Sequence, residues 1–227
     1  MAIIEPDIDA TNYFVDDVVE AEPKHGTTIQ AGWDAVTAAS KPKRESSNYP
    51  TDFKFEEKAQ LVRFLDNEPF AVYQQHWVQV PNDNGSLSWR SFVALGDDDP
   101  LTVIAGLTPR PKAAFNILNL SLEQPEVQTL TASVTLARQL QAANEDPRRG
   151  PLSKYYWAIS RQGMGRETQF TVDRVKATDL AEEWDLDYEE IDAIAATAPR
   201  YDAKSIYVKT YEEHLKVARQ LVGTGTN

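Results

Sequence analysis

Residues 154–172 read KYYWAISRQGMGRETQFTV and distribute aromatic and basic side chains along two predicted strands. Successive side chains of a strand point to opposite faces, so Lys154 and Tyr156 share one face while Trp157 and Arg161 share the other. One of these faces must belong to the protein core. The second face would combine aromatic planes with cations, a combination that suits stacked bases and their phosphates.

The turn between these strands and the local charge both indicate an anion site. Residues 163–166 read GMGR, and the glycines let backbone amides and the Arg166 guanidinium approach an anion closely. Residues 148–176 carry seven Lys and Arg against two acids, although the whole chain has a net charge of −12. A basic segment in an acidic protein is where a polyanion is expected to bind, with a solvated charged hairpin as the alternative.

Short alternating segments elsewhere in the chain predict further strands. The run 81–86 contains Asn84-Gly85 and favours a tight hairpin, because glycine accepts the positive φ that such turns require. Ser133 offers an N-cap to a helix with apolar residues at helical spacing. The expected strands cover residues 59–65, 70–80, 89–95, 115–120, 126–131, 154–161 and 169–175, and the expected helices cover residues 134–143, 187–197 and 210–222. This order predicts a mainly β fold with added helices (α+β), built on a small barrel or sandwich.

The composition is that of a globular chain. Hydrophobic residues make up 41% of the 227 residues, and no apolar run approaches the roughly 18 residues of a membrane span. The acidic start lacks the basic and apolar regions of a signal peptide, so we expect a cytoplasmic protein without membrane contact. The absence of cysteine excludes disulfides, thiolate metal sites and cysteine nucleophiles.

Residues that could support catalysis do not form a motif. The consecutive acids 97–99 precede a proline, as in a solvated turn, whereas metal-dependent nucleases bring acids together from separate elements. The histidines are far apart in sequence and match no zinc motif: His25, His76 and His214. We therefore expect no enzyme activity, no cofactor and no bound metal, with a nuclease built on residues 97–99 as an alternative.

The candidate ligand-binding residues are strand aromatics with polar neighbours and long cations, which are rarely buried without a partner. The candidate stacking residues are Tyr156 and Trp77, followed by Trp89 and Tyr73. The candidate phosphate contacts are Lys154, Arg161, Arg166 and Arg174, followed by Lys58, Arg63 and Arg90. The expected core comprises Phe64, Leu65, Val72, Val93, Ile117, Leu136 and Leu140. The alternative for each aromatic residue is that it also belongs to the core.

The motif Trp-Ala-Ile-Ser-Arg-x-Gly-x-Gly at residues 157–165, with Phe-Asn-Ile-Leu-Asn-Leu at residues 115–120, resembles the single-stranded DNA-binding proteins of tailed bacteriophages, particularly those that infect actinobacteria. The resemblance covers about residues 53–186. It implies a five-stranded OB-fold barrel with an inserted helix and C-terminal helices. Many relatives carry a zinc-binding insertion where this chain has Asp99-Pro100-Leu101-Thr102, and without cysteines that zinc site must be absent.

The resemblance also implies a domain organisation and a biological setting. We expect an acidic N-terminal arm (residues 1–50), an OB-fold single-stranded DNA-binding domain (residues 51–180) and an acidic C-terminal helical segment (residues 181–227). The implied role is sequence-tolerant binding of single-stranded DNA in phage replication, recombination or repair, in the cytoplasm of an infected bacterium. Phage or host replication proteins are candidate partners of the acidic segments. The alternative function is an OB-like protein-interaction or virion component that does not bind nucleic acid.

Overall fold

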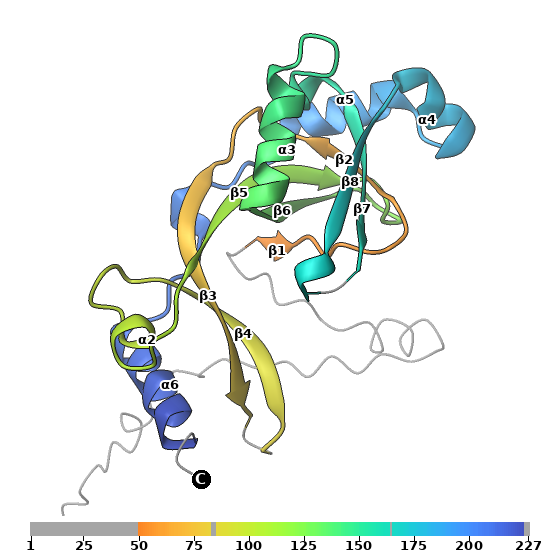
Figure 1. Cartoon of the computed structure of the whole chain (residues 1–227). Coiled ribbons are helices and arrows are strands. Elements are labelled where there is room, and N and C mark those ends of the chain that lie inside the picture. Colours follow the sequence, from red (N-terminus) through yellow and green to blue (C-terminus); the bar gives the residue numbers. More distant parts are fainter. Residues whose placement is uncertain (1–49, 83–84, 164, 225–227) are drawn as a thin grey trace, which may run out of the picture. The chain divides into compact units, whose positions relative to one another are not determined.

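The computed structural model describes residues 50–82, 85–163 and 165–224, which all belong to one unit of the chain, Ser46–Asn227 (Figure 1). The predicted N-terminal arm, residues 1–50, lies outside the described residues apart from Pro50. The side chain of Arg166 also lies outside the described part of the chain.

The described residues form a mixed α/β fold with one eight-stranded sheet and five α-helices, which agrees with the expected β fold with added helices. The strands are β1 (Thr51–Asp52), β2 (Gln60–Phe64), β3 (Ala71–Pro81), β4 (Leu87–Val93), β5 (Arg110–Asn119), β6 (Glu126–Ser133), β7 (Tyr156–Gln162) and β8 (Gln169–Val175). The helices are α2 (Pro100–Val103), α3 (Val134–Glu145), α4 (Ala177–Glu183), α5 (Tyr188–Thr197) and α6 (Tyr211–Thr224), with 3-10 turns η1 (Leu152–Lys154), η2 (Gly165–Glu167) and η3 (Ala203–Ser205).

Strand β5 is the centre of the sheet because it pairs with three other strands. It runs antiparallel to β6 along residues 112–119, to β3 through residues 110–114 and to β2 through residues 117–119. β7 pairs with β2 and β8, and β4 extends the sheet by pairing with β3. Among the described strands β6 and β8 do not pair, so the sheet is open and the closed barrel that the resemblance implies is not confirmed.

The segment after β1 runs between β6 and β7. The Phe53 amide donates to a β6 carbonyl at 2.9 Å, and the Glu56 carbonyl accepts from the Arg161 amide of β7 at 2.8 Å. The rings of Phe53, Phe55 and Phe170 meet edge to face, with successive centroids 5.2 and 4.9 Å apart. Backbone hydrogen bonds and aromatic packing together therefore connect β6 to the β7–β8 hairpin.

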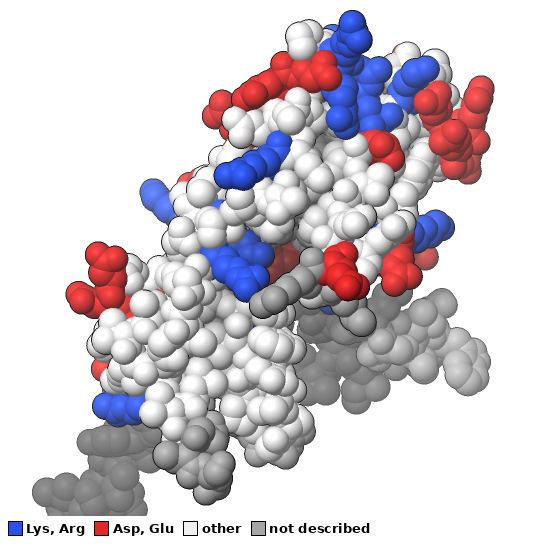
Figure 2. Space-filling model, in the orientation of Figure 1, with Lys and Arg blue, Asp and Glu red and all other residues white. Residues whose placement is uncertain are grey.

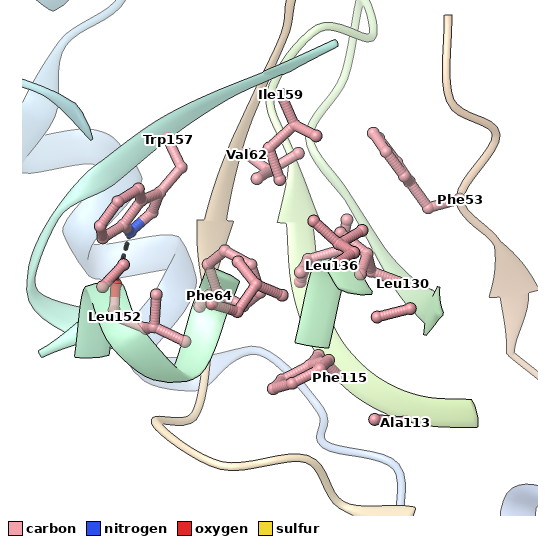
Figure 3. Packing of buried hydrophobic residues seen from close by; sticks show 14 residues of the cluster. Phe53, Val62, Phe64, Ala113, Phe115, Leu130, Leu136, Leu152, Trp157 and Ile159 are labelled. Carbon is pink, nitrogen blue, oxygen red and sulfur yellow. Dashed lines mark hydrogen bonds between the residues drawn. The ribbon is translucent and has the colours of Figure 1, made fainter. Parts of the chain in front are cut away.

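The main hydrophobic core lies between one face of the sheet and α3 (Figure 3). Trp157 is fully buried there, and its indole Nε1 donates to the Leu152 carbonyl at 2.9 Å. Ser133 caps α3 by accepting a hydrogen bond from the Leu136 amide, as predicted. The structure confirms the predicted core residues Phe64, Leu65, Ile117, Leu136 and Leu140, leaves Val93 half-buried, and shows that the prediction for Val72 is wrong because this residue is 71% exposed.

A second core covers the opposite face of β2, β5 and β7. Leu180 of α4 and Ile191 and Ala195 of α5 pack there with Leu61 and Tyr156. Both faces of β7 are therefore buried along part of its length. The described part of the predicted acidic C-terminal segment, residues 181–224, packs onto the sheet and the hairpin.

The β3–β4 hairpin extends beyond the rest of the sheet and packs on α2 and α6 (Figure 1). Phe92 of the hairpin lies in a small core with Leu101 of α2 and with Val217 and Ala218 of α6. This third core gives the hairpin one buried face, without which an isolated hairpin would be only marginally stable.

Asp99 connects these three elements through a fully buried carboxylate. Its oxygens accept hydrogen bonds from the amides of Leu95 at 2.9 Å and Leu101 at 2.8 Å, which caps α2. His214 Nδ1 of α6 lies 3.0 Å from Asp99 Oδ1 and must donate, because a carboxylate only accepts. His76 Nε2 of the hairpin lies 3.4 Å from Asp99 Oδ2. One carboxylate thus holds the hairpin, α2 and α6 together.

The environment of this cluster shifts two pKa values downward. Burial lowers the pKa of His76, with the nearby Asp99 carboxylate opposing the shift and His214 adding to it. Burial alone would raise the pKa of Asp99, but hydrogen bonds from His214 and from the amides of Leu95 and Leu101 bring it below its ordinary value. Asp99 is therefore ionised and His76 neutral near pH 7.

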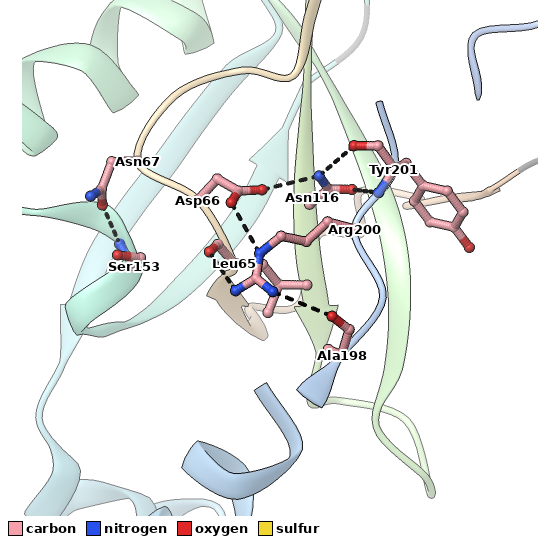
Figure 4. A network of polar contacts seen from close by, with 8 residues as sticks. All are labelled: Leu65, Asp66, Asn67, Asn116, Ser153, Ala198, Arg200 and Tyr201. Atoms are coloured by element: carbon pink, nitrogen blue, oxygen red, sulfur yellow. Dashed lines mark hydrogen bonds and ion pairs between the residues drawn. The ribbon is translucent and has the colours of Figure 1, made fainter. Parts of the chain in front are cut away.

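A polar network fixes the segment between α5 and α6 to the sheet (Figure 4). Arg200 Nε donates to Asp66 Oδ1 at 3.1 Å. The buried Asn116 side chain of β5 donates to the Tyr201 carbonyl and accepts from the Tyr201 amide, both at 3.0 Å. These contacts determine where the chain runs as it approaches residues 205–209.

The pKa of His76 predicts how stability depends on pH. Because the folded-state pKa is below the unfolded value of about 6.5, the unfolded state binds more protons as the pH falls, and stability decreases below that value. Urea denaturation at pH 7.5 and 5.5 should show this decrease, and the decrease should be smaller in His76→Gln. An equal decrease in the wild type and the variant would contradict this assignment. Asp99 remains ionised across this range and does not account for the change.

Candidate nucleic-acid interface

Trp77 and Trp89 form an exposed aromatic pair on the β3–β4 hairpin. The strand register pairs Trp77 with Ser91 and Gln79 with Trp89, so the two indoles are diagonal neighbours on one face. Their rings are parallel to within 4°, their centroids are 6.0 Å apart, and the residues are 61% and 56% exposed. Large aromatic rings left together in water are typical of a binding surface.

The tryptophan pair lines a hollow of about 540 Å³. Tyr73 shares its face of β3 with Trp77, since side chains of a strand alternate with a period of two. Thr129 and Thr131 of β6 line the hollow from the sheet, and residues 205–207 line it from the segment fixed by Arg200. The site is therefore assembled from the hairpin, the central sheet and the C-terminal segment.

Cations outnumber acids in this hollow. Arg90 and Lys209 line it, and burial lowers the pKa of Lys209, with Glu213 opposing the decrease and Arg90 adding to it. Asp52 is the one acid among the described lining residues, and burial raises its pKa against the effect of Lys54. The electrostatic potential of the hollow is therefore positive relative to the acidic chain as a whole.

Two further cations lie on the same face of the sheet beside Tyr73. The register pairs Lys112 with Tyr73 and Arg110 with Gln75. Burial lowers the pKa of Lys112, and the positive charge of Arg110 adds to the decrease. Within residues 50–82, 85–163 and 165–224, none of the four cations forms an ion pair with an acid. These cations are Arg110, Lys112, Arg90 and Lys209. Four positive charges thus remain available to an anionic ligand.

The chemistry of the hollow suits a ligand that combines flat rings with negative charges. Exposed indoles offer planes for stacking, and Lys and Arg offer charge-assisted bonds to phosphate. A single-stranded nucleic acid carries both complementary groups.

The structure brings together three of the predicted site residues, Tyr73, Trp77 and Trp89, on one face of β3 and β4. Arg90 borders the hollow, but the register pairs it with Val78 on the opposite face, where its guanidinium donates to Asn82 Oδ1 and Ser88 Oγ. Sequence reasoning missed Lys209, because it lies outside every predicted strand and helix. It also missed Arg110 and Lys112, because the expected strand starts at residue 115, whereas β5 begins at Arg110. The alternation of Arg110 and Lys112 ahead of the apolar part of β5 is the signal that could have identified them.

The predicted stacking role of Tyr156 is wrong. Tyr156 is only 4% exposed, and its hydroxyl donates to Asp192 of α5 at 2.6 Å. Arg63, a predicted phosphate contact, forms an ion pair with the same Asp192 and donates to the Tyr156 hydroxyl at 3.0 Å. The packing of α5 on this face explains both results, because a strand pattern does not reveal which distant helix will cover it.

The predicted basic hairpin supplies cations to two separate places. Lys154 and Arg174 lie over the Tyr155 ring, at 5.5 and 4.7 Å from its centroid, at one end of β7. Arg161 lies at the other end of β7, about 20 Å away by the rise of a strand. Lys58 is exposed in the connection between β1 and β2 and does not line the hollow.

The acids considered for a nuclease do not converge. Asp97 and Asp98 are exposed, whereas Asp99 is buried and engaged in capping α2 and binding histidine. In the part of the chain that the structure describes, no group of three or more His, Cys, Asp or Glu residues is placed to hold a metal ion.

Comparisons of the chain with models of protein families, with curated proteins and with solved structures found no match. The resemblance to phage proteins therefore rests on the sequence motifs alone. No helix among the described residues has both the length and the apolar character needed to cross a membrane.

The contrast between Tyr156 and Trp77 can be tested by stability measurements. Tyr156→Ala should lower the free energy of unfolding by about 3–5 kcal/mol, because it leaves a cavity in a core. Trp77→Ala should cost about 1 kcal/mol, since it removes only an exposed ring contact. Urea denaturation of both variants measures the difference, and similar costs would contradict the placement of one ring in the core and the other in solvent.

Proposed function

We propose that this protein binds single-stranded DNA without sequence preference, in the hollow beside the β3–β4 hairpin. The observation that carries the proposal is the exposed parallel pair of Trp77 and Trp89 beside cations that have no acidic partner among the described residues. Bases stack on the indoles, and sequence tolerance follows because every base has a π-face.

The cations at this site contact the phosphates on either side of the stacked bases. Lys209 lines the hollow, Arg90 borders it from the other face of the hairpin, and Lys112 lies beside Tyr73 at its margin. Mutual repulsion between Lys209 and Arg90, and between Lys112 and Arg110, is relieved when phosphates approach. The site therefore favours a polyanion over a neutral apolar surface.

The acidic composition of the chain is compatible with this role. Eight acids lie between residues 179 and 192, and Figure 2 shows acidic atoms gathered over the end of the molecule where α4 lies in Figure 1. Acids in this part of the surface keep the protein soluble and disfavour non-specific association with duplex, while the local field at the hollow remains positive.

The order of strand pairing supports an OB-type fold as part of the proposal. β2 and β3 both pair with β5, as two halves of a broken first strand, and β5, β6, α3, β7 and β8 then follow in the order of an OB fold. OB folds bind oligonucleotides on strands 2 and 3 and on the loops between strands 1 and 2 and strands 4 and 5. The hollow lies on the equivalent elements, with the β3–β4 hairpin as the enlarged first loop.

The motif of residues 157–165 supports a setting in phage DNA replication, recombination or repair, in the cytoplasm of an infected bacterium. In this proposal the protein has no catalytic role. The acidic surface of α4 and α5 is then a candidate contact for replication proteins of the phage or host.

Binding to oligothymidine of 30 nucleotides tests the proposal. Fluorescence polarisation at low salt should show tight binding to the single strand and weak binding to the matching duplex, with quenching of tryptophan fluorescence. Trp77→Ala and Trp89→Ala should each weaken binding about 5- to 150-fold, from about 1–3 kcal/mol per stacked base. Tyr188→Ala removes an exposed aromatic of α5 and serves as the control that should bind normally. Absence of binding at low salt would overturn the proposal and favour a protein-docking role.

The salt dependence of binding tests the phosphate contacts separately. Lys209→Gln should reduce the slope of log affinity against log salt by about 0.7, the value for one phosphate contact on a single strand. Lys216→Gln, an exposed lysine of α6 outside the hollow, removes the same charge and should leave the slope unchanged. Equal slopes in the two variants would show that Lys209 makes no phosphate contact.

A further inference from the structure

A second group of cations lies at the end of the molecule where α3 ends and β8 lies. This cationic patch consists of Arg148, Arg149, Lys154 and Arg174. Figure 2 shows Lys and Arg atoms gathered at this end, with further basic atoms between it and the hairpin.

The contacts of the cationic patch leave its charge uncompensated. Arg149 Nη2 donates to the Val172 carbonyl at 2.9 Å, and Arg174 donates to the Arg148 carbonyl. Lys154 and Arg174 also lie over the Tyr155 ring. These partners are carbonyl groups and a ring, and no carboxylate among the described residues forms an ion pair with the patch.

A hollow of about 460 Å³ lies on the other face of the sheet from the proposed DNA site, where Val72, Ala113 and Phe115 face α3. Lys112, which pairs with Tyr73 at the DNA site, lines one part of it, and Leu152, two residues before Lys154, lines another. Arg138 of α3 is an exposed cation on its wall, and the exposed Val72 offers an apolar contact for sugars or bases. The acids that line it are Glu68 and Glu145.

We infer that a longer single strand leaves the tryptophan site over Lys112, crosses the start of β5 where β6 ends at Ser133, enters this hollow beside Arg138 and reaches the cationic patch. The inference rests on the proposed function and extends it from a stacking site to a continuous path. Cations at the DNA site, on the wall of the hollow and in the patch then contact successive parts of the phosphate backbone. Each contact releases counterions, so affinity and its salt dependence increase with the length of the strand.

The test compares oligothymidines of 8 and 30 nucleotides on full-length protein. The path variant is Arg138→Gln with Lys154→Gln, which removes two exposed cations. The matched control is Lys216→Gln with Arg219→Gln, which removes one lysine and one arginine from the exposed surface of α6. Both variants change the net charge equally, and circular dichroism and urea denaturation check that both fold.

For the 30-mer, the path variant should bind about 10- to 25-fold more weakly than the wild type near 0.1 M salt, and its salt slope should be lower by about 1.4. For the 8-mer it should match the wild type within twofold, and the control should match the wild type with both oligomers. If the 8-mer binds but the path variant and the control bind the 30-mer equally, the path is wrong and the stacking site stands. If neither oligomer binds the wild type, the proposed function itself fails.

Discussion

The buried carboxylate of Asp99 is the interaction on which the functional part of the structure depends. It accepts hydrogen bonds from two backbone amides and from His214, and it lies beside His76, so one charged group joins α2, α6 and the hairpin. A buried charge is costly unless it is fully hydrogen-bonded, and here each partner comes from an element that must be in place. The orientation of the hairpin, and of its tryptophan pair, follows from that requirement.

The proposed DNA site is assembled from segments that are distant in sequence and meet on one face of the sheet. The hairpin supplies the indoles, β6 supplies threonines, and the segment after α5 supplies Lys209. Arg200 and Asn116 fix that last segment through Asp66 and Tyr201. Rigid packing on both sides of the hollow positions the aromatic and charged groups before a ligand arrives, which reduces the entropy lost on binding.

Acidic and basic side chains are concentrated on different surfaces of the molecule. The acids of α4 and α5 lie on helices that bury the outer face of β7, and Asp192 also binds Arg63 and Tyr156. Among the described residues, the cations of the hollow and of the cationic patch contact rings, carbonyl groups and the side chains of Asn82 and Ser88 instead of acids. The net charge of the chain therefore influences its solubility, whereas the local arrangement of charged side chains determines where a polyanion can bind.

The sequence by itself determined most of the strands, the capped helix α3 and most of the main core, and it singled out Trp77 and Trp89 as candidate site residues, because alternation, turn residues and capping are local properties. Tertiary structure alone decided that Tyr156 is buried, that Arg63 is paired with Asp192 and that Lys209 joins the hairpin. The physical reason is that a strand has two faces of similar character, and a helix more than 30 residues away decides which face is covered. The openness of the sheet between β6 and β8 likewise depends on long-range pairing that no local pattern encodes.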